Sequence, residues 1–266
     1  MIRDITLGQY YPADSVLHRL DPRVKLCGTL IYVISLFLFQ SFTGYIVATV
    51  FLVSLIILSR VPVSFMVKGL RAVMILLIFT AVLNAFLTPG RTLVSFWKIN
   101  ITIEGVRLAA FMVIRLVYLI VGSSVLTLTT TPSELTDGLE KGLGWLKTFR
   151  VPVNEIAMMM SIALTFIPVL LEETDRIIKA QQARGADFDS GNIIRRIRAL
   201  VPILVPLFVS AFRRANDLAL AMESRCYRGG EGRTKLHPLK YTFRDGIAYA
   251  VLALYLVLIV IVGFKM

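Results

Sequence analysis

Two arginines, Arg184 and Arg225, are the side chains in this sequence whose type and spacing best suit a chemical role. Each stands between small residues at the end of a helix-like segment, in the tripeptides Ala183-Arg184-Gly185 and Ser224-Arg225-Cys226. A guanidinium is planar and permanently charged, and it binds carboxylates and carbonyl groups with a geometry that lysine does not reproduce. We therefore expect two fixed docking charges for a protein partner, and no catalytic residue.

Helix capping is the simpler explanation for either arginine taken alone. Glycine at position 185 accepts the left-handed conformation that closes a helix, and a cation in the last turn complements the helix dipole by about 0.3–1 kcal/mol. Two such sites, each after an apolar half-helix of similar length, favour a shared function. Cys226 departs from the glycine pattern, so the second helix is predicted to break later, at Gly229-Gly230.

The composition indicates a membrane protein. Hydrophobic residues make up 56% of the chain, charged residues only 17%, and the mean hydropathy is +0.75. Soluble domains contain roughly 45–50% apolar residues. The net charge of +12 fits the excess of Lys and Arg in cytoplasmic loops and their attraction to anionic lipid, so no nucleic-acid partner is expected.

Five apolar segments are long enough, with their flanking residues, to cross a bilayer, which takes roughly 17–25 helical residues. They run over Leu26–Phe42, Tyr45–Leu58, Val73–Leu87, Leu108–Leu128 and Ile247–Phe264. Basic residues precede the first segment and lie between the second and third, which places the N-terminus in the cytoplasm. The loop Thr88–Arg107 and the C-terminus are then predicted to be external.

Two shorter apolar blocks, Ile156–Leu171 and Leu200–Phe212, lie in the basic segment between the fourth and fifth spans. Each continues into a charged stretch, Glu172–Arg184 or Arg213–Arg225. We expect two long helices with their apolar halves at the membrane and their polar ends toward the cytosol. If these blocks enter the bilayer, the number of spans rises from five to as many as seven.

The predicted fold class is therefore all-α, a polytopic membrane protein with about five transmembrane helices and a cytoplasmic pair of long helices. Residues 1–130 form an N-terminal cytoplasmic segment and four transmembrane helices. Residues 131–242 form the cytoplasmic or interfacial helical domain, and residues 243–266 form the last transmembrane helix.

A methionine-rich stretch on the first long helix is a candidate contact surface for a partner. Methionine is flexible and polarisable, and it recurs on surfaces that accept several partners. Lipid or core packing is the simpler explanation of the same stretch. We assign Met158, Met159 and Ala163 as a partner contact.

Arg115, the single charge within the five spans, is expected to have a structural role, and a part in a gate is the alternative. A charge at membrane depth costs roughly 2.5–3.5 kcal/mol, so it normally faces protein or water. A bond to Asn84 or to a carbonyl group in the bundle would satisfy it.

Enzymatic functions find little support in the sequence. The chain lacks the G-x-x-x-x-G-K-[ST] phosphate loop, so any ATP must be hydrolysed by a partner. Its two histidines, His18 and His237, lie outside the spans, and we expect no metal site. A stand-alone secondary transporter or channel remains an alternative, although one intramembrane charge and no repeated halves speak against it.

The chain resembles the transmembrane T component, of the EcfT/CbiQ type, of energy-coupling factor transporters, which are modular ABC-type importers. The stretches that carry the resemblance are, in order, His18 to Lys25 (HRLDPRVK), Thr130 to Leu135 (TTPSEL), Phe166-Ile167-Pro168, and the two arginine sites. Together they extend over nearly the whole chain.

The resemblance implies a partner for each arginine. Arg184 and Arg225, with neighbours Ala183, Gly185, Ser224 and Cys226, would close two coupling helices that dock on two P-loop ATPase subunits. These partners would bind ATP and magnesium, and this chain would bind no cofactor. A small membrane-embedded S component would bind the substrate, a vitamin or related micronutrient. A T component dedicated to cobalt or nickel is the alternative within the family, and a prokaryotic plasma membrane is the expected location.

Overall fold

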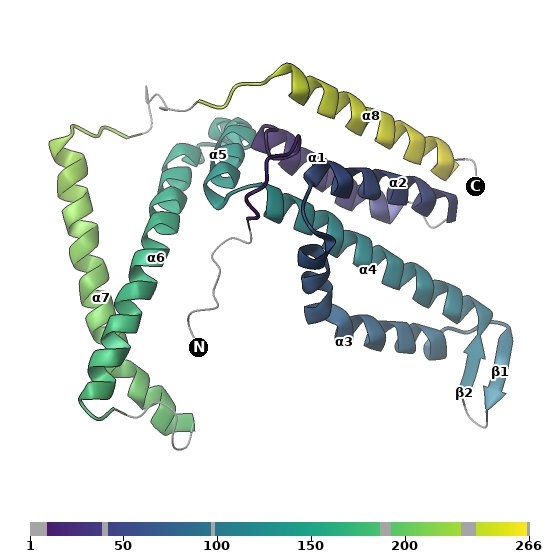
Figure 1. The fold of residues 1–266 in the computed structure, drawn as a ribbon, viewed down its shortest axis with the longest axis horizontal. Coiled ribbons are helices and arrows are strands. Elements are labelled where there is room, and N and C mark those ends of the chain that lie inside the picture. The colour runs from purple at the N-terminus through teal and green to yellow at the C-terminus, as the bar shows by residue number, and fades with distance from the viewer. Residues whose placement is uncertain (1–9, 39–41, 97–98, 187–192, 230–237, 265–266) are drawn as a thin grey trace. The chain divides into compact units, whose positions relative to one another are not determined.

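The computed structural model describes residues 10–38, 42–96, 99–186, 193–229 and 238–264. The chain divides into two compact units, one formed by residues 8–138 with 239–266 and the other by residues 139–238. Apart from one short hairpin, the described elements are helices (Figure 1). The prediction of an all-α polytopic membrane protein is confirmed.

The first unit is a bundle of long helices. Its elements are α1 (Pro22–Leu38), α2 (Phe42–Ser59), α3 (Val63–Leu87), the strands β1 (Thr92–Phe96) and β2 (Ile99–Thr102), α4 (Ile103–Thr129) and α8 (Phe243–Phe264). The helix α5 (Pro132–Gly142) follows α4 and leads into the second unit, which holds the 3₁₀ helix η1 (Gly144–Phe149), α6 (Val153–Ala183) and α7 (Ile193–Ser224).

Five described helices are long and apolar enough to cross a membrane: α2, α4, α6, the Ala199–Ser224 part of α7, and α8 up to Val262. A sixth candidate is α3, whose halves Val63–Arg71 and Val73–Phe86 meet at an angle of 62°. The set therefore includes the two helices that the sequence analysis placed at the interface. It leaves out α1, which has 17 residues.

Aromatic side chains with polar tips form the centre of the bundle. Tyr255 of α8 stacks on Phe51 of α2 with ring centroids 4.1 Å apart. The hydroxyl of Tyr255 lies 2.8 Å from the Ser35 hydroxyl of α1, where both groups are buried. Such pairing satisfies the polar atoms that a buried tyrosine brings into an apolar core.

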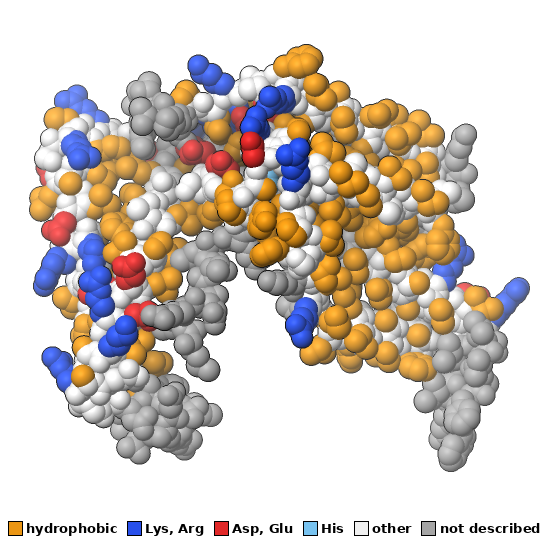
Figure 2. Space-filling model, in the orientation of Figure 1, with side chains coloured by type: hydrophobic (Ala, Val, Ile, Leu, Met, Phe, Trp, Pro, Cys, Tyr) orange, Lys and Arg blue, Asp and Glu red, His pale blue; other side chains and the backbone are white. Residues whose placement is uncertain are grey.

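The outer surface of the bundle is apolar. Ile57 of α2 and Ile75 of α3 expose 70% and 84% of their surface, and Figure 2 shows hydrophobic side chains spread over α2, α3 and α4. Soluble monomers rarely expose apolar patches of this extent. The exposed apolar face is what a lipid-facing surface requires.

Buried carboxylates join the beginnings of α1 and α8. Asp245 accepts hydrogen bonds from the backbone N–H of Asp21 at 2.9 Å and from the N–H and hydroxyl of Thr242, both at 2.7 Å. Asp21 in turn pairs with Arg23 at 2.8 Å, and the Arg23 guanidinium lies 3.8 Å from the Tyr241 ring centre. Burial alone would raise the pKa of Asp21, but the side-chain and backbone hydrogen bonds from Arg23 outweigh it and hold that pKa below its ordinary value.

Helix boundaries differ from those expected, because polar residues continue the helices past the apolar runs. The first helix begins at Pro22 instead of Leu26, since Asp21 caps it by accepting the backbone N–H of Arg23 at 2.9 Å. The expected loop Thr88–Arg107 contains the antiparallel β1–β2 hairpin, and α4 already begins at Ile103. Thr102 caps α4 by accepting the N–H of Gly105 at 3.1 Å.

In the second unit, α6 and α7 are the two long helices that the sequence predicted. They run in opposite directions and pack against each other (Figure 1). Pro168 lies inside α6, and Pro202 and Pro206 lie inside α7, without ending either helix.

Candidate functional site

Both arginine sites end their helices with the same backbone geometry. At the end of α6, the N–H of Gly185 bonds to Gln182 O at 2.9 Å and the N–H of Ala186 bonds to Gln181 O at 3.0 Å. Gly185 has φ of +86°. This pattern of two backward bonds around a left-handed residue is the Schellman motif.

The end of α7 repeats this motif. The N–H of Cys226 bonds to Glu223 O at 2.8 Å, and the N–H of Tyr227 bonds to Met222 O at 3.0 Å. Cys226 takes the left-handed position with φ of 55°. The prediction that this helix continues to Gly229-Gly230 is therefore wrong, because a non-glycine residue adopts the terminating conformation at Cys226.

The two arginines occupy the same position in these motifs. Arg184 and Arg225 each directly follow the last helical residue and directly precede the left-handed one. Both arginines are exposed, as are the neighbours Ala183, Gly185, Ser224 and Cys226. Among the described residues neither guanidinium has an ion-pair partner, so both charges are available to another molecule.

An ion pair between the helices relates the two sites. Arg214 Nη2 of α7 lies 3.5 Å from Glu173 Oε2 of α6. Arg184 follows Glu173 by eleven positions and Arg225 follows Arg214 by eleven positions. At a helical rise of 1.5 Å per residue, each arginine lies roughly 16 Å along its helix from this contact. Because the helices are antiparallel, the two arginines lie at opposite ends of the pair.

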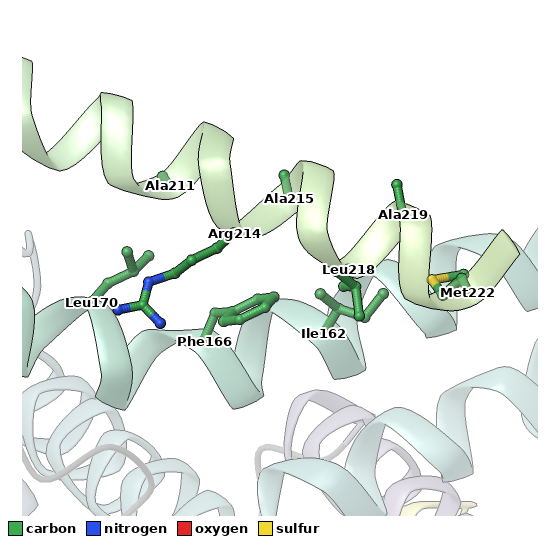
Figure 3. Close-up of a pocket in the computed structure, with 9 residues that line it drawn as sticks. All are labelled: Ile162, Phe166, Leu170, Ala211, Arg214, Ala215, Leu218, Ala219 and Met222. Atoms are coloured by element: carbon green, nitrogen blue, oxygen red, sulfur yellow. The ribbon is translucent and has the colours of Figure 1, made fainter. Parts of the chain in front are cut away.

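A wedge-shaped apolar cavity lies between the two helices beside this ion pair (Figure 3). It has a volume of about 250 Å³ and is lined by Ile162, Phe166 and Leu170 of α6 and by Ala211, Ala215, Leu218, Ala219 and Met222 of α7, with Arg214 at one end. The Nε atom of Arg214 is buried there with no hydrogen-bond partner in the described part of the chain. The wedge thus presents an apolar surface with one unused donor.

The methionine-rich stretch lies near the beginning of α6. Met159 exposes 61% of its surface, Ala163 is also exposed, and Met158 is half-buried. Met159 and Ala163 are four residues apart and so share one face of the helix. The structure leaves this face open to a partner or to lipid.

The sequence analysis missed the contact between Glu173 and Arg214. Their separation of 41 positions equals that between the two arginine sites, and this repeated spacing was the available signal. The neighbouring carboxylates of Glu172 and Glu173 contact Arg176 and Arg214, respectively. No group of residues suited to a metal ion occurs in the ranges that the structure covers, and His237 lies outside them.

Arg115 lies within the bundle, where its guanidinium is 5.4 Å from the Phe37 ring centre. Asn84, one of the partners expected for it, donates to the carbonyl of Thr80 at 2.8 Å. The cation over an aromatic ring agrees with a structural contact inside the bundle.

Comparison with known proteins decides the family. Residues 13–236 match the family described as CbiQ, cobalt transport protein. An energy-coupling factor transporter transmembrane protein EcfT from Clostridium kluyveri is 56% identical over 250 residues, which is 93% of each chain. The chain belongs to this family of transporter transmembrane proteins.

Other EcfT proteins are similar over almost their full length. That of Brevibacillus brevis is 51% identical over 98% of both chains, and that of Ruminiclostridium cellulolyticum is 48% identical over 99% of both chains. Membership in the EcfT family agrees with the T-component role and does not favour a stand-alone transporter or channel. The chain is a multi-pass membrane protein and a transporter subunit.

Two stretches that carried the resemblance to the EcfT family have structural roles in this chain. Asp21 and Arg23, in the first stretch, form the buried ion pair at the start of α1. In the second, Thr131 and Glu134 form a capping box, in which Glu134 accepts the N–H of Thr131 at 3.0 Å and Thr131 accepts the N–H of Glu134 at 3.2 Å. These stretches fix the ends of helices, whereas the arginine sites leave charge exposed.

Proposed function

We propose that this chain is the energy-coupling T component of a vitamin or micronutrient importer, with Arg184 and Arg225 docked on two P-loop ATPase subunits. The partners bind ATP and magnesium and perform the hydrolysis, while this chain binds no cofactor and catalyses no reaction. Movement of the ATPases displaces α6 and α7, and that displacement reorients a substrate-binding S component.

The observation that carries this proposal is the repetition of one capping motif at opposite ends of an antiparallel helix pair. A helix that ends in a Schellman motif holds its terminal residue in a defined position. The exposed guanidinium therefore meets its partner with little loss of backbone freedom, which favours binding. Two equivalent charges at opposite ends of the pair suit two equivalent partners.

The S component is proposed to contact α6 at Met158, Met159 and Ala163. The exposed face formed by Met159 and Ala163 supports this assignment. The apolar wedge, with the unused Nε donor of Arg214, adds a second surface that a partner helix would cover. Flexible methionines would allow different S components to bind the same T component.

The proposed location is the plasma membrane of a prokaryote, with the N-terminus in the cytoplasm. Arg60 follows α2, and Lys68 and Arg71 lie on the first half of α3, so basic residues gather at the end of the bundle where α2 leads into α3. An excess of Lys and Arg marks the cytoplasmic side.

Charge reversal at both arginines tests the docking assignment. In the complete transporter, the Arg184→Glu, Arg225→Glu double variant is expected to lose both ATPase subunits during affinity purification through the tagged chain. Each single variant is expected to retain less of the ATPase pair than the unmodified chain but more than the double variant, because one docking site remains. The bound subunits are measured by quantitative mass spectrometry.

The matched control is the Arg176→Glu, Arg213→Glu double variant, which reverses two exposed charges on the same helices away from their ends. It is expected to retain the ATPases at the unmodified level. Gel filtration and thermal unfolding in detergent check that both double variants fold. If the folded Arg184, Arg225 variant still brings down the ATPases and supports uptake, the docking assignment is wrong.

A further inference from the structure

Two adjoining cavities at one end of the bundle have the properties of a lipid site. The first is an open polar cavity of about 590 Å³ whose charged residues are Arg19, Arg60, Arg244 and Asp14. The second is an apolar cavity of about 390 Å³ between α1, α2, α4 and α8. Val16, Leu58 and Arg244 line both, so the two cavities are adjacent.

The charges of the polar cavity do not balance. Arg19 engages the carboxylate of Asp14 through two hydrogen bonds of 2.7 and 2.5 Å, which also lower the pKa of Asp14 below its ordinary value. Within the described ranges, Arg60 donates a hydrogen bond to the backbone carbonyl of Asp14 at 3.5 Å and forms no ion pair, although its charge also acts on the Asp14 carboxylate. Arg244 has no ion-pair partner within the described ranges. Two guanidinium groups therefore remain for an anion.

The apolar cavity suits a hydrocarbon chain. Its walls include the aromatic rings of Tyr32 and Phe51 and the aliphatic side chains of Val125 and Leu252. Lys25, a half-buried cation in its wall, already donates to the carbonyl groups of His18 at 3.1 Å and Thr129 at 2.9 Å. Apolar cavities even of about 150 Å³ stay dry and take up hydrocarbon ligands.

The position of these cavities along the bundle fits the surface of a membrane leaflet. Arg60 directly follows the last residue of α2, and Arg244 is the second residue of α8. Arg19 precedes α1. In the proposed orientation this end of the bundle faces the cytoplasm, where basic pockets between transmembrane helices recognise anionic headgroups.

We propose that the two cavities bind one anionic phospholipid, with its phosphate between Arg60 and Arg244 and an acyl chain in the apolar cavity. Arginine suits this role because its planar fork binds phosphate oxygens in pairs. The lipid would fill the space between α2 and α8 that protein side chains leave open, and so would stabilise the bundle. This site is separate from the two docking arginines.

Lipid binding to the purified transporter tests the proposal. Native mass spectrometry after delipidation would compare phosphatidylglycerol with phosphatidylcholine of the same acyl chains. The unmodified protein is expected to bind one phosphatidylglycerol in preference to phosphatidylcholine. Since an arginine near anionic lipid contributes about fivefold in affinity, Arg60→Gln with Arg244→Gln is expected to weaken phosphatidylglycerol binding by roughly 25-fold.

The control for charge is Arg91→Gln with Arg176→Gln, two exposed arginines that line neither cavity, and it is expected to bind lipid normally. Thr29→Phe tests the apolar cavity, which Thr29 lines, by filling it. That variant is expected to bind phosphatidylglycerol at least tenfold more weakly, with thermal unfolding as the check on folding. Every variant should keep its ATPase subunits, which separates this test from that of the docking arginines.

Three results would overturn the proposal. Equal binding of the two lipids would show that the arginines do not select the headgroup. Unchanged binding in either the Arg60, Arg244 variant or the folded Thr29 variant would place the lipid elsewhere. Displacement of the lipid by an equal concentration of glycerol 3-phosphate would identify a soluble phosphate as the occupant.

Discussion

The carboxylate of Asp245, at the start of α8, links the beginnings of α1 and α8. Asp245 is 1% exposed and accepts three hydrogen bonds, one from Asp21 and two from Thr242. A buried carboxylate is tolerable because these donors replace water. Removing the carboxylate leaves the buried N–H of Asp21 without its acceptor, whereas the donors of the exposed Thr242 can turn to water.

Asp245→Ala is therefore expected to destabilise the protein by about 2–3 kcal/mol, since hydrogen bonds to charged groups contribute about 1.5–3 kcal/mol each and the gap partly admits water. Denaturant unfolding in detergent would measure the change. Asp217→Ala, at an exposed position of α7, is the control and is expected to change stability by less than about 0.5 kcal/mol. Equal stability of the two variants would contradict the role given to Asp245.

At the scale of the helix, the two arginine sites share a backbone motif but differ in the residue that forms it. Gly185 adopts its left-handed φ of +86° without a side chain to oppose it. Cys226 adopts φ of 55° with one. Left-handed backbone costs a non-glycine residue roughly 1–2 kcal/mol. The left-handed residue that ends α7 therefore costs conformational free energy that Gly185, at the end of α6, does not.

Cys226→Gly is accordingly expected to stabilise the end of α7 by about 1 kcal/mol, and Gly185→Ala to destabilise the end of α6 by a similar amount. Amide hydrogen exchange at the last turns of both helices measures these changes. Gly246→Ala serves as control, because this helical glycine also has open space around it and no left-handed φ. It is expected to stabilise by about 0.4–1 kcal/mol. If Gly185→Ala were equally stabilising, the left-handed cap would not exist in solution.

At the scale of the whole molecule, the orientation in the membrane determines which partners each surface can meet. The docking arginines act only if both Arg184 and Arg225, at opposite ends of the α6–α7 pair, face the ATPases. Cys226, exposed beside Arg225, is a natural reporter of that side.

A membrane-impermeant maleimide is expected to label Cys226 in inside-out vesicles and not in intact cells. Arg91→Cys, placed between α3 and β1 in a Cys27→Ser, Cys226→Ser background, is expected to show the opposite pattern. The background protein without Arg91→Cys gives the unlabelled baseline. Labelling of Cys226 in intact cells would reverse the proposed orientation.

Much of the molecule could be predicted because its signals are local. Apolar runs predicted α2, α4 and α8 as spans, and the change from apolar to charged residues predicted α6 and α7 as continuous helices. The helix ends were harder to predict. Cys226 ends α7 by adopting a conformation that its residue type disfavours, so local propensity pointed to the later Gly229-Gly230 instead.

The sequence by itself determined the class of membrane protein, the family, and the two arginines with the greatest claim to function, because hydropathy, charge and tripeptide motifs are properties of neighbouring residues. Only the tertiary structure decided that Glu173 meets Arg214 and that Arg60 and Arg244 line one cavity. The residues of each pair are far apart in the chain, and their meeting depends on how whole helices pack. Patterns among neighbouring residues therefore do not show that these side chains meet, and the repeated spacing of 41 positions gave only an indirect sign of the Glu173–Arg214 contact.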